Sequence, residues 1–480
     1  MASIKKNFAY NSILMVSNYI INLILFPYCA RVLGVERFGT INFTQNIVQY
    51  FMFIAMMGIT HIGVREIAKQ TNKQDLNKCY SSMLGLNLLY TAISLTIFVP
   101  LIFLVERFAE IKILFLLGAF QILFSAFSVE WYFRGTENFK YITIRNIIIK
   151  ILYVLCVFLF VKVPDDFVLF FLLTVLMTAV CAIINYMYAQ KYVHFSIRSV
   201  NLGTYLKPSL SLGAYSILTS MYTTFNVAYL GMVWDDVNVG YYTTALKLYT
   251  VILGFYSAFT GVMLPRMTAI TGSGDENSFK GLINKSFELF YTISIPTVVV
   301  LFVLAPEVIT LLAGIEYEPA IIMSRIVIPM LFVVGIAQIL SFQILIPKGF
   351  DKITLYASII GAVIGVSANI FLTTAYGATG TCITVVVTEV CVTSFYIISC
   401  IRHKLVTFDL RLLFKHLIAA LPYLIICVMV HNLMGDKWLM ALTISCTLSF
   451  IYFVISQYYI LHNRLIVGYI TIFVKKRNNL

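Results

Sequence analysis

The chain has 480 residues, of which 60% are hydrophobic and only 11% are charged, and its mean hydropathy is +0.91. A soluble core of this length needs much less apolar surface, so the composition excludes a soluble globular protein and indicates an integral membrane protein. The formal net charge of +13 suits contact with anionic lipid headgroups, and no nucleic-acid partner is expected.

Apolar segments of roughly 19–23 residues, the length that crosses about 30 Å of hydrocarbon, can be placed fourteen times along the chain. The sequence therefore predicts an all-α integral membrane protein with about fourteen transmembrane helices. The predicted spans are 8–30, 40–63, 80–104, 111–131, 142–163, 166–188, 208–231, 242–264, 285–305, 321–346, 353–374, 378–400, 416–433 and 438–460.

Neither a metal site nor a nucleotide site is indicated by the polar residues. The nine cysteines are an odd number without a CxxC pair, and the six histidines form no HExxH motif. The phosphate-binding pattern GxxxxGK[ST] is absent as well. We expect no cofactor, no metal and no enzymatic activity, and the sequence encodes no ATP-driven pump.

The basic residues predict the orientation. With a cytoplasmic N-terminus, 25 of the 34 Lys and Arg residues fall on the inner side and 7 on the outer side. This asymmetry favours an even number of spans with both termini in the cytoplasm, because positively charged segments stay on that side.

An internal duplication is indicated by a shift of 201 residues, which pairs Gly39 with Gly240 and Arg65 with Arg266. The shift predicts two pseudo-symmetric six-helix lobes of the same orientation, at residues 1–200 and 201–407, with two further helices and a cytoplasmic tail at 408–480. It also superposes polar residues inside the helices: Asn18 and Asn22 on Thr219 and Thr223, and Asn42, Asn46 and Gln49 on Thr243, Lys247 and Thr250.

Lys247 is the charge that most needs an explanation, because an ammonium inside a spanning helix costs about 2.5–3.5 kcal/mol on insertion scales. It shares a polar stripe with Thr243 and Thr250. One interpretation places the stripe on a cavity between the lobes. The alternative is that Lys247, about 9 Å from the outer end of its helix, extends to the interface.

Other charges carry similar pairs of interpretations. Arg31 and Arg325, at outer helix ends, are path residues or interfacial anchors, and Arg65 and Arg266, at inner ends, are anchors or gate residues. Lys150 is expected to extend toward the inner interface. Glu389 lies about 16 Å from either end of its span, which makes it a candidate proton carrier or a neutral carboxyl bonded to a neighbouring helix.

Five segments resemble signatures of the polysaccharide-transporter (Wzx-type) branch of the MATE-like exporters, and they occur in the expected order. The segment at 130–142 departs from that family at Arg134, where Gln is more usual, and its Trp131 is expected to anchor at the interface. The segments are RVLGVERFG (31–39), GVREIAK (63–69), EWYFRGTENFKYI (130–142), MLPRMTAI (263–270) and LLAGIEYEPA (311–320).

The resemblance implies a flippase of the bacterial inner membrane that exports undecaprenyl-pyrophosphate-linked oligosaccharide repeat units by alternating access, driven by an ion gradient. Its cargo serves lipopolysaccharide O-antigen or capsule synthesis, and a polysaccharide polymerase and a chain-length regulator are its expected protein partners. In this interpretation Arg31, Lys247 and Arg325 contact phosphate or an anionic sugar. The path is lined by Asn18, Asn22, Asn42, Asn46, Gln49, Thr219 and Thr223, and coupling or gating is served by Glu389, Arg65 and Arg266.

Three alternatives stay open. A MATE-type drug or cation antiporter shares the fold, but its cavity is smaller and commonly acidic, and a lipid II flippase belongs to the same superfamily. A membrane polysaccharide polymerase or ligase needs a large outer loop with catalytic residues. The predicted outer loops are short, and WDD (234–236) and PDD (164–166) are their only compact acidic groups.

Overall fold

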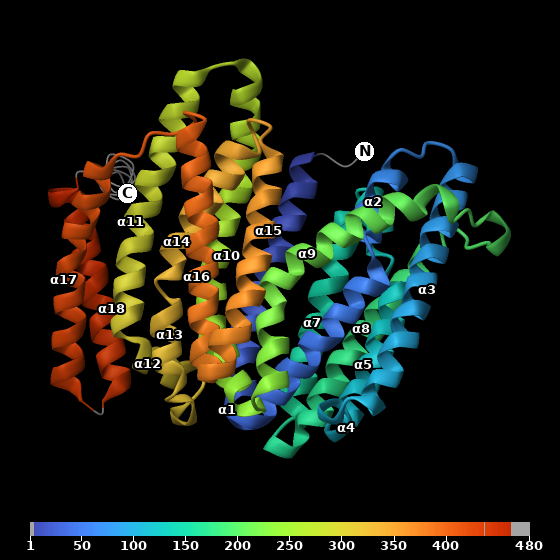
Figure 1. Ribbon diagram of the computed structural model, residues 1–480, viewed down its shortest axis with the longest axis horizontal. Helices are drawn as coiled ribbons and strands as arrows, with labels where there is room; N and C mark the ends of the chain where they lie inside the picture. Colours follow the sequence, from blue (N-terminus) through green and yellow to red (C-terminus); the bar gives the residue numbers. More distant parts are fainter. Residues whose placement is uncertain (1–3, 436, 462–480) are drawn as a thin grey trace, which may run out of the picture. The chain divides into compact units, whose positions relative to one another are not determined.

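The computed structural model describes residues 4–435 and 437–461, and within these ranges it contains helices and no strands (Figure 1). The predicted all-α membrane fold is confirmed. Eleven helices of the described part are long and apolar enough to cross a membrane, and two of them, of 53 and 52 residues, are interrupted. The interruptions lie at Gly34 (φ 69°) and Gly377 (φ 57°), where glycine tolerates the positive φ. The count of fourteen spans stays a prediction.

The helices gather into two compact units, and the first consists of Met1–Thr243 with Val366–Thr381. Figure 1 shows α2 at the upper end of this unit and α4 at the lower end. Its helices are α1 (Ile4–Met56), α2 (Ile59–Ala68), α3 (Lys73–Leu104), α4 (Glu106–Glu110), α5 (Lys112–Ser125), η1 (Ala126–Ser128), α6 (Glu130–Gly135), α7 (Phe139–Phe160), η2 (Pro164–Asp166), α8 (Phe167–Ala189), η3 (Ile197–Ser199), α9 (Gly203–Val233) and the start of α10 (Asp236–Ser273).

Helices α1 and α7 run in the same direction along their length. The Thr143 hydroxyl donates to the Tyr10 carbonyl at 3.0 Å, and the Tyr28 hydroxyl donates to the Val161 carbonyl at 2.6 Å. Contacts that advance together along both helices require parallel axes. This agrees with the expectation that the first and fifth spans cross the membrane in the same direction.

Aromatic residues fill the core at the end of unit 1 where α2, α3 and α6 meet. Trp131 is only 1% exposed, and its ring lies 5.6 Å from that of Tyr80. A Cβ on Gly63 would come within 3.0 Å of the Trp131 ring, so the absence of a side chain there admits the indole. The expectation that Trp131 anchors at the membrane interface is wrong, because burial of its large apolar surface in this core is more favourable.

The second unit consists of Thr244–Gly365 with Cys382–Leu480. It contains the rest of α10 and most of α16 (Thr374–Arg402). The last residues of α15 (Asp351–Ala368) and the π-helical turn η6 (Asn369–Thr373) belong to unit 1. Its other helices are α11 (Glu276–Val303), α12 (Ala305–Leu312), η4 (Ile315–Tyr317), α13 (Ala320–Val327), α14 (Met330–Gln338), η5 (Ile339–Leu345), α15 (Asp351–Ala368), α17 (Leu410–Met434), α18 (Trp438–Ile455) and η7 (Ser456–Ile460).

The two C-terminal helices pack onto unit 2. The Thr292 hydroxyl of α11 lies 3.1 Å from Nε2 of His416 on α17, and the rings of Tyr423 on α17 and Tyr452 on α18 meet edge to face at 4.8 Å. Hydrogen bonds between helices are favourable where no water competes, so α17 is fixed against α11. The division of the chain into lobes at 1–200, 201–407 and 408–480 stays a prediction.

Candidate functional site

The polar stripe in the first half of α1 meets a cation of α7. The Lys150 ammonium, near the middle of α7, donates to Oδ1 of Asn18 at 2.5 Å, whereas Asn22 is exposed. The expectation that Lys150 extends to the inner interface is wrong, because the parallel course of α1 and α7 places the Asn18 amide at its own depth. The pair provides a positive charge and an amide inside the spanning helices.

After Gly34, α1 carries the second group of predicted path residues. Their side chains differ in which hydrogen-bonding groups are already used. Asn42 uses its Nδ2 to donate to the Phe38 carbonyl at 2.7 Å, so its amino group is partly committed to its own helix. The Oδ1 of Asn46 is buried and has no hydrogen-bond partner among the described residues. Gln49, one turn further, is half-buried. Asn46 therefore has the clearest unused capacity, since a buried polar atom normally finds a partner.

Lys247 lies on α10, and its side chain is half-buried. None of the hydrogen bonds or ion pairs found among the described residues involves its ammonium. Its predicted stripe neighbours bond to their own helix: Thr243 donates to the Val239 carbonyl at 2.8 Å and Thr250 to the Lys247 carbonyl at 3.0 Å. The side chains of Thr219 and Thr223, also predicted path residues, fall outside the described part.

The predicted outer-end cations have different surroundings. Arg31 is exposed on α1, just before Gly34. Arg325 of α13 donates through Nε to the Phe302 carbonyl at 3.2 Å, and its guanidinium lies 5.9 Å from the centre of the Phe302 ring. It borders a mainly apolar cavity of about 870 Å³ in unit 2, which Glu318 and His431 also line. An arginine beside apolar walls can hold a phosphate next to a hydrocarbon chain.

The residues proposed for coupling or gating lie on three separate helices. Arg65 of α2 is exposed and donates to Glu66 at 2.8 Å. Arg266 of α10 is exposed. Glu389 is half-buried within α16.

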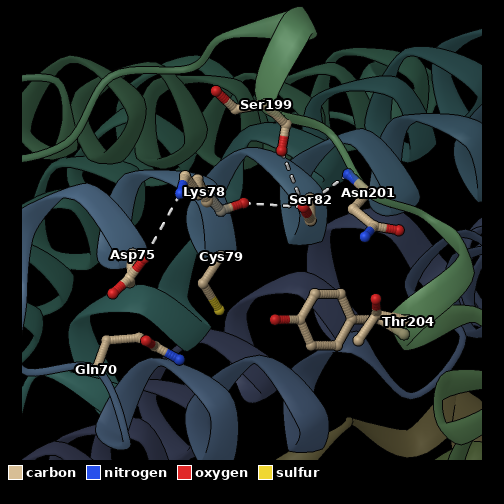
Figure 2. Close-up of a pocket in the computed structure, with 9 residues that line it drawn as sticks. Gln70, Asp75, Lys78, Cys79, Ser82, Ser199, Asn201 and Thr204 are labelled. Atoms are coloured by element: carbon tan, nitrogen blue, oxygen red, sulfur yellow. Dashed lines mark hydrogen bonds and ion pairs between the residues drawn. The ribbon is translucent and has the colours of Figure 1, made fainter.

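A polar pocket of about 290 Å³ lies where α3 begins and the segment between α8 and α9 crosses it (Figure 2). The Ser82 hydroxyl donates to the Lys78 carbonyl at 2.8 Å and accepts the Asn201 backbone N–H at 2.9 Å, while Lys78 pairs with Asp75 at 3.7 Å. The Ser82 hydroxyl thus holds the crossing segment against α3, whereas Asp75 and Lys78 pair with each other within α3. At this volume the pocket is at the lower limit for a ligand site.

Sequence patterns missed Lys150 as a partner of the polar stripe on α1, although one signal was present. Its place near the middle of a spanning helix makes a bare ammonium as costly as at Lys247. That cost implies a polar partner inside the bundle. The identity of the partner, Asn18, depends on helix packing between residues 132 positions apart.

The model of the family described as "Polysaccharide biosynthesis protein" matches residues 4–271, more than half of the chain. The chain belongs to this family. Two relatives of this family member are named "Putative O-antigen transporter". The one from Shigella dysenteriae is 28% identical over 82% of this chain and 98% of its own length. The one from Escherichia coli (strain K12) is 24% identical over 84% of this chain and 98% of its own length.

Solved structures of transporters share the fold of this family member. The lipid II flippase MurJ in its inward closed conformation has a TM-score of 0.76 at 15% identity, over 94% of this chain and 99% of that one. The MATE multidrug transporter DinF-BH has a TM-score of 0.57 at 15% identity, over 86% and 97%. At these identities the likeness establishes the fold alone.

Proposed function

We propose that this chain is a flippase for lipid-linked oligosaccharide repeat units of the O-antigen or capsule type, with undecaprenyl pyrophosphate as the carrier. The observation that supports this most strongly is that two relatives named for O-antigen transport align over 98% of their own lengths. The fold, shared with a lipid II flippase, suits a lipid-linked cargo.

The chemistry of the path residues supports the same cargo. An oligosaccharide cannot cross hydrocarbon unless its hydroxyl groups keep hydrogen-bond partners, and a pyrophosphate needs a counter-charge. The amides of Asn18 and Asn46 supply hydrogen bonds, and the ammonium groups of Lys150 and Lys247 supply charge. The prenyl chain stays in the lipid.

In this proposal the other predicted residues keep their roles. The phosphate-contacting cations are Lys247, Arg31 and Arg325, and Glu389 is the proton carrier of an ion-gradient-driven alternating-access cycle. Arg65 and Arg266 hold the inner helix ends or gate them. The remaining path residues are Asn22, Asn42, Gln49, Thr219 and Thr223.

The protein would act in the bacterial cytoplasmic membrane with both termini inside, and a polymerase and a chain-length regulator would receive its product. The experiment is deletion of the gene followed by complementation. We expect surface polysaccharide to disappear on deletion, lipid-linked repeat units to accumulate in the inner leaflet, and both effects to be reversed by the wild-type gene.

The rival functions give different outcomes in the same strain. A drug antiporter predicts intact surface polysaccharide with increased drug sensitivity. A lipid II flippase predicts a cell-wall defect that O-antigen status does not alter. A polymerase or ligase predicts repeat units that reach the outer leaflet but stay unpolymerised or unattached. Any of these three results would contradict the proposal.

A further inference from the structure

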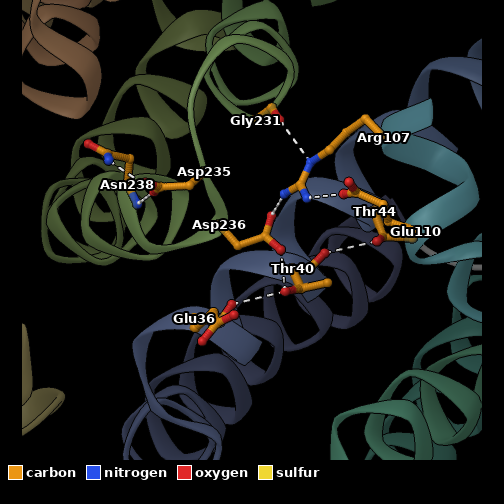
Figure 3. Close-up of polar contacts among 9 residues, drawn as sticks. All are labelled: Glu36, Thr40, Thr44, Arg107, Glu110, Gly231, Asp235, Asp236 and Asn238. Atoms are coloured by element: carbon orange, nitrogen blue, oxygen red, sulfur yellow. Dashed lines mark hydrogen bonds and ion pairs between the residues drawn. The ribbon is translucent and has the colours of Figure 1, made fainter. Parts of the chain in front are cut away.

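A buried carboxylate at one end of unit 1 joins three elements of the chain (Figure 3). Asp236, the first residue of α10, is 8% exposed. Its Oδ2 accepts the Thr40 hydroxyl of α1 at 2.6 Å, and its Oδ1 accepts Nη2 of Arg107 of α4 at 2.5 Å. Both carboxylate oxygens are therefore bonded by residues that lie far from Asp236 in the sequence.

The guanidinium of Arg107 is held on several sides. Its Nη1 donates to Glu110 at 2.8 Å, its Nε donates to the Gly231 carbonyl at 3.4 Å, and its centre lies 5.6 Å from the middle of the Phe43 ring. Partial burial acts to lower the pKa of Arg107, but the hydrogen bond to Glu110 and the charge of Asp236 raise it above its usual value. The Arg107 guanidinium thus keeps its positive charge beside Asp236.

Beside this ion pair the backbones of α1 and α10 touch. A Cβ placed on Gly39 would overlap the Asp236 carbonyl oxygen, and a Cβ on Gly240 would overlap the Val35 carbonyl oxygen. A side chain on Gly231 would likewise strike the Phe43 ring. Helices in backbone contact leave no room for a sugar between them, so α1 and α10 are closed to cargo at this point.

This end of unit 1 is the one that the sequence predicts to face outward, because it carries the segments 31–39 and 232–241 between successive spans. We propose that Asp236, Arg107 and Thr40 form a latch that holds α1 and α10 together at the outer end, and that the latch opens to release the cargo. The proposal rests on the proposed flippase function.

A disulfide lock tests the latch directly. Thr40 and Asp236 make side-chain contact, so in the double variant Thr40→Cys/Asp236→Cys an oxidant joins the two thiols into a disulfide and a reductant restores them. We expect the oxidised double variant to lose at least about tenfold of its export rate and to regain it after reduction. The single variants Thr40→Cys and Asp236→Cys should not respond to oxidant.

The outcomes separate the latch from the proposed function. Bond formation is verified by loss of maleimide labelling relative to the reduced form. Export that continues unchanged in a verified disulfide-bonded protein would overturn the latch. In that case, export by the reduced protein would still support the flippase function.

A second variant removes the charge without a crosslink. Asp236→Asn weakens the bond to Arg107, so the latch should open more often. A cysteine introduced at Asn46 should then be labelled several-fold faster than without Asp236→Asn by a membrane-impermeant maleimide added from outside. The matched control is Asp165→Asn, which removes an ion pair with Arg37. The Asp165 side chain is 88% exposed. Equal labelling rates in Asp236→Asn and the control would also contradict the latch.

Discussion

Gly39 and Gly240 lie against each other's helix through equivalent contacts. The Cβ that Gly39 lacks would meet the Asp236 carbonyl, and the Cβ that Gly240 lacks would meet the Val35 carbonyl. The shift of 201 residues that converts Gly39 into Gly240 also converts Val35 into Asp236. The contact therefore maps onto itself, as an isologous contact does at a two-fold axis.

Substitution of either glycine by alanine should destabilise the protein. The new methyl group meets a backbone carbonyl, which cannot rotate away, and such overpacking costs about 1–3 kcal/mol or more. We expect Gly39→Ala and Gly240→Ala to lower the melting temperature of the detergent-solubilised protein by several degrees. Gly281→Ala on α11 is the control, because a Cβ there meets nothing within 4 Å. A melting temperature of Gly39→Ala equal to that of Gly281→Ala would contradict the contact.

Loss of the Lys150 ammonium should impair export without affecting insertion. A hydrogen bond to a charged group contributes about 1.5–3 kcal/mol, so Lys150→Ala should weaken cargo affinity about tenfold or more. Lys150→Arg should retain more activity because it keeps the charge. Surface polysaccharide is measured relative to the amount of each variant in the membrane. Lys162→Ala, at an exposed position just beyond the end of α7, is the control. If Lys150→Ala exports as the control does, Lys150 is not a cargo residue.

Lys247 offers a comparison between two explanations of a membrane-embedded cation. If it contacts an anionic part of the cargo, export should decrease in the order wild type, Arg, Ala, Glu, because Lys247→Glu places like charges together. If the ammonium only extends to the interface, alanine removes an insertion cost and should be tolerated. Surface display per inserted protein distinguishes the two. Near-normal display with Lys247→Ala or Lys247→Glu would remove Lys247 from the path.

Glu389→Gln tests the proposed coupling. Glutamine keeps the shape of a protonated carboxyl but cannot release a proton, so export by this variant should no longer respond to the proton gradient. Transport into vesicles is followed with and without an imposed pH difference, and the total rate should fall at least about tenfold in the presence of the gradient. An unchanged rate with unchanged gradient dependence would exclude Glu389 as the carrier.

The spanning helices were predictable because long apolar segments are a property of the sequence alone. The interruptions at Gly34 and Gly377 fall between predicted spans, but in the structure helical residues lie directly on both sides of each glycine. Glycine at a positive φ permits a sharp change of direction without a loop. Such a break is not visible in hydropathy, which reports only composition.

The contacts of the site were predictable only in part. The acidic group 234–236 stood out in the sequence, but its meaning depends on Arg107, which packing brings to Asp236. Likewise Lys150 was expected to extend to the inner interface, and its actual partner, Asn18, is brought to it by the packing of α1 against α7. Pairings between helices far apart in the chain depend on tertiary packing, which one sequence does not specify locally.

This protein is proposed to move lipid-linked oligosaccharide across a bilayer with the help of an ion gradient. The most direct measurement uses the purified chain in vesicles with an imposed pH difference. The vesicles contain an undecaprenyl-pyrophosphate-linked oligosaccharide with a labelled sugar, whose exposure to a membrane-impermeant glycosidase is followed. We predict that the labelled oligosaccharide shielded in the inner leaflet becomes accessible to the glycosidase at a rate well above that in empty vesicles. Lys150→Ala should slow this rate. Accessibility that stays at the level of empty vesicles, in protein shown to be folded, would contradict the account.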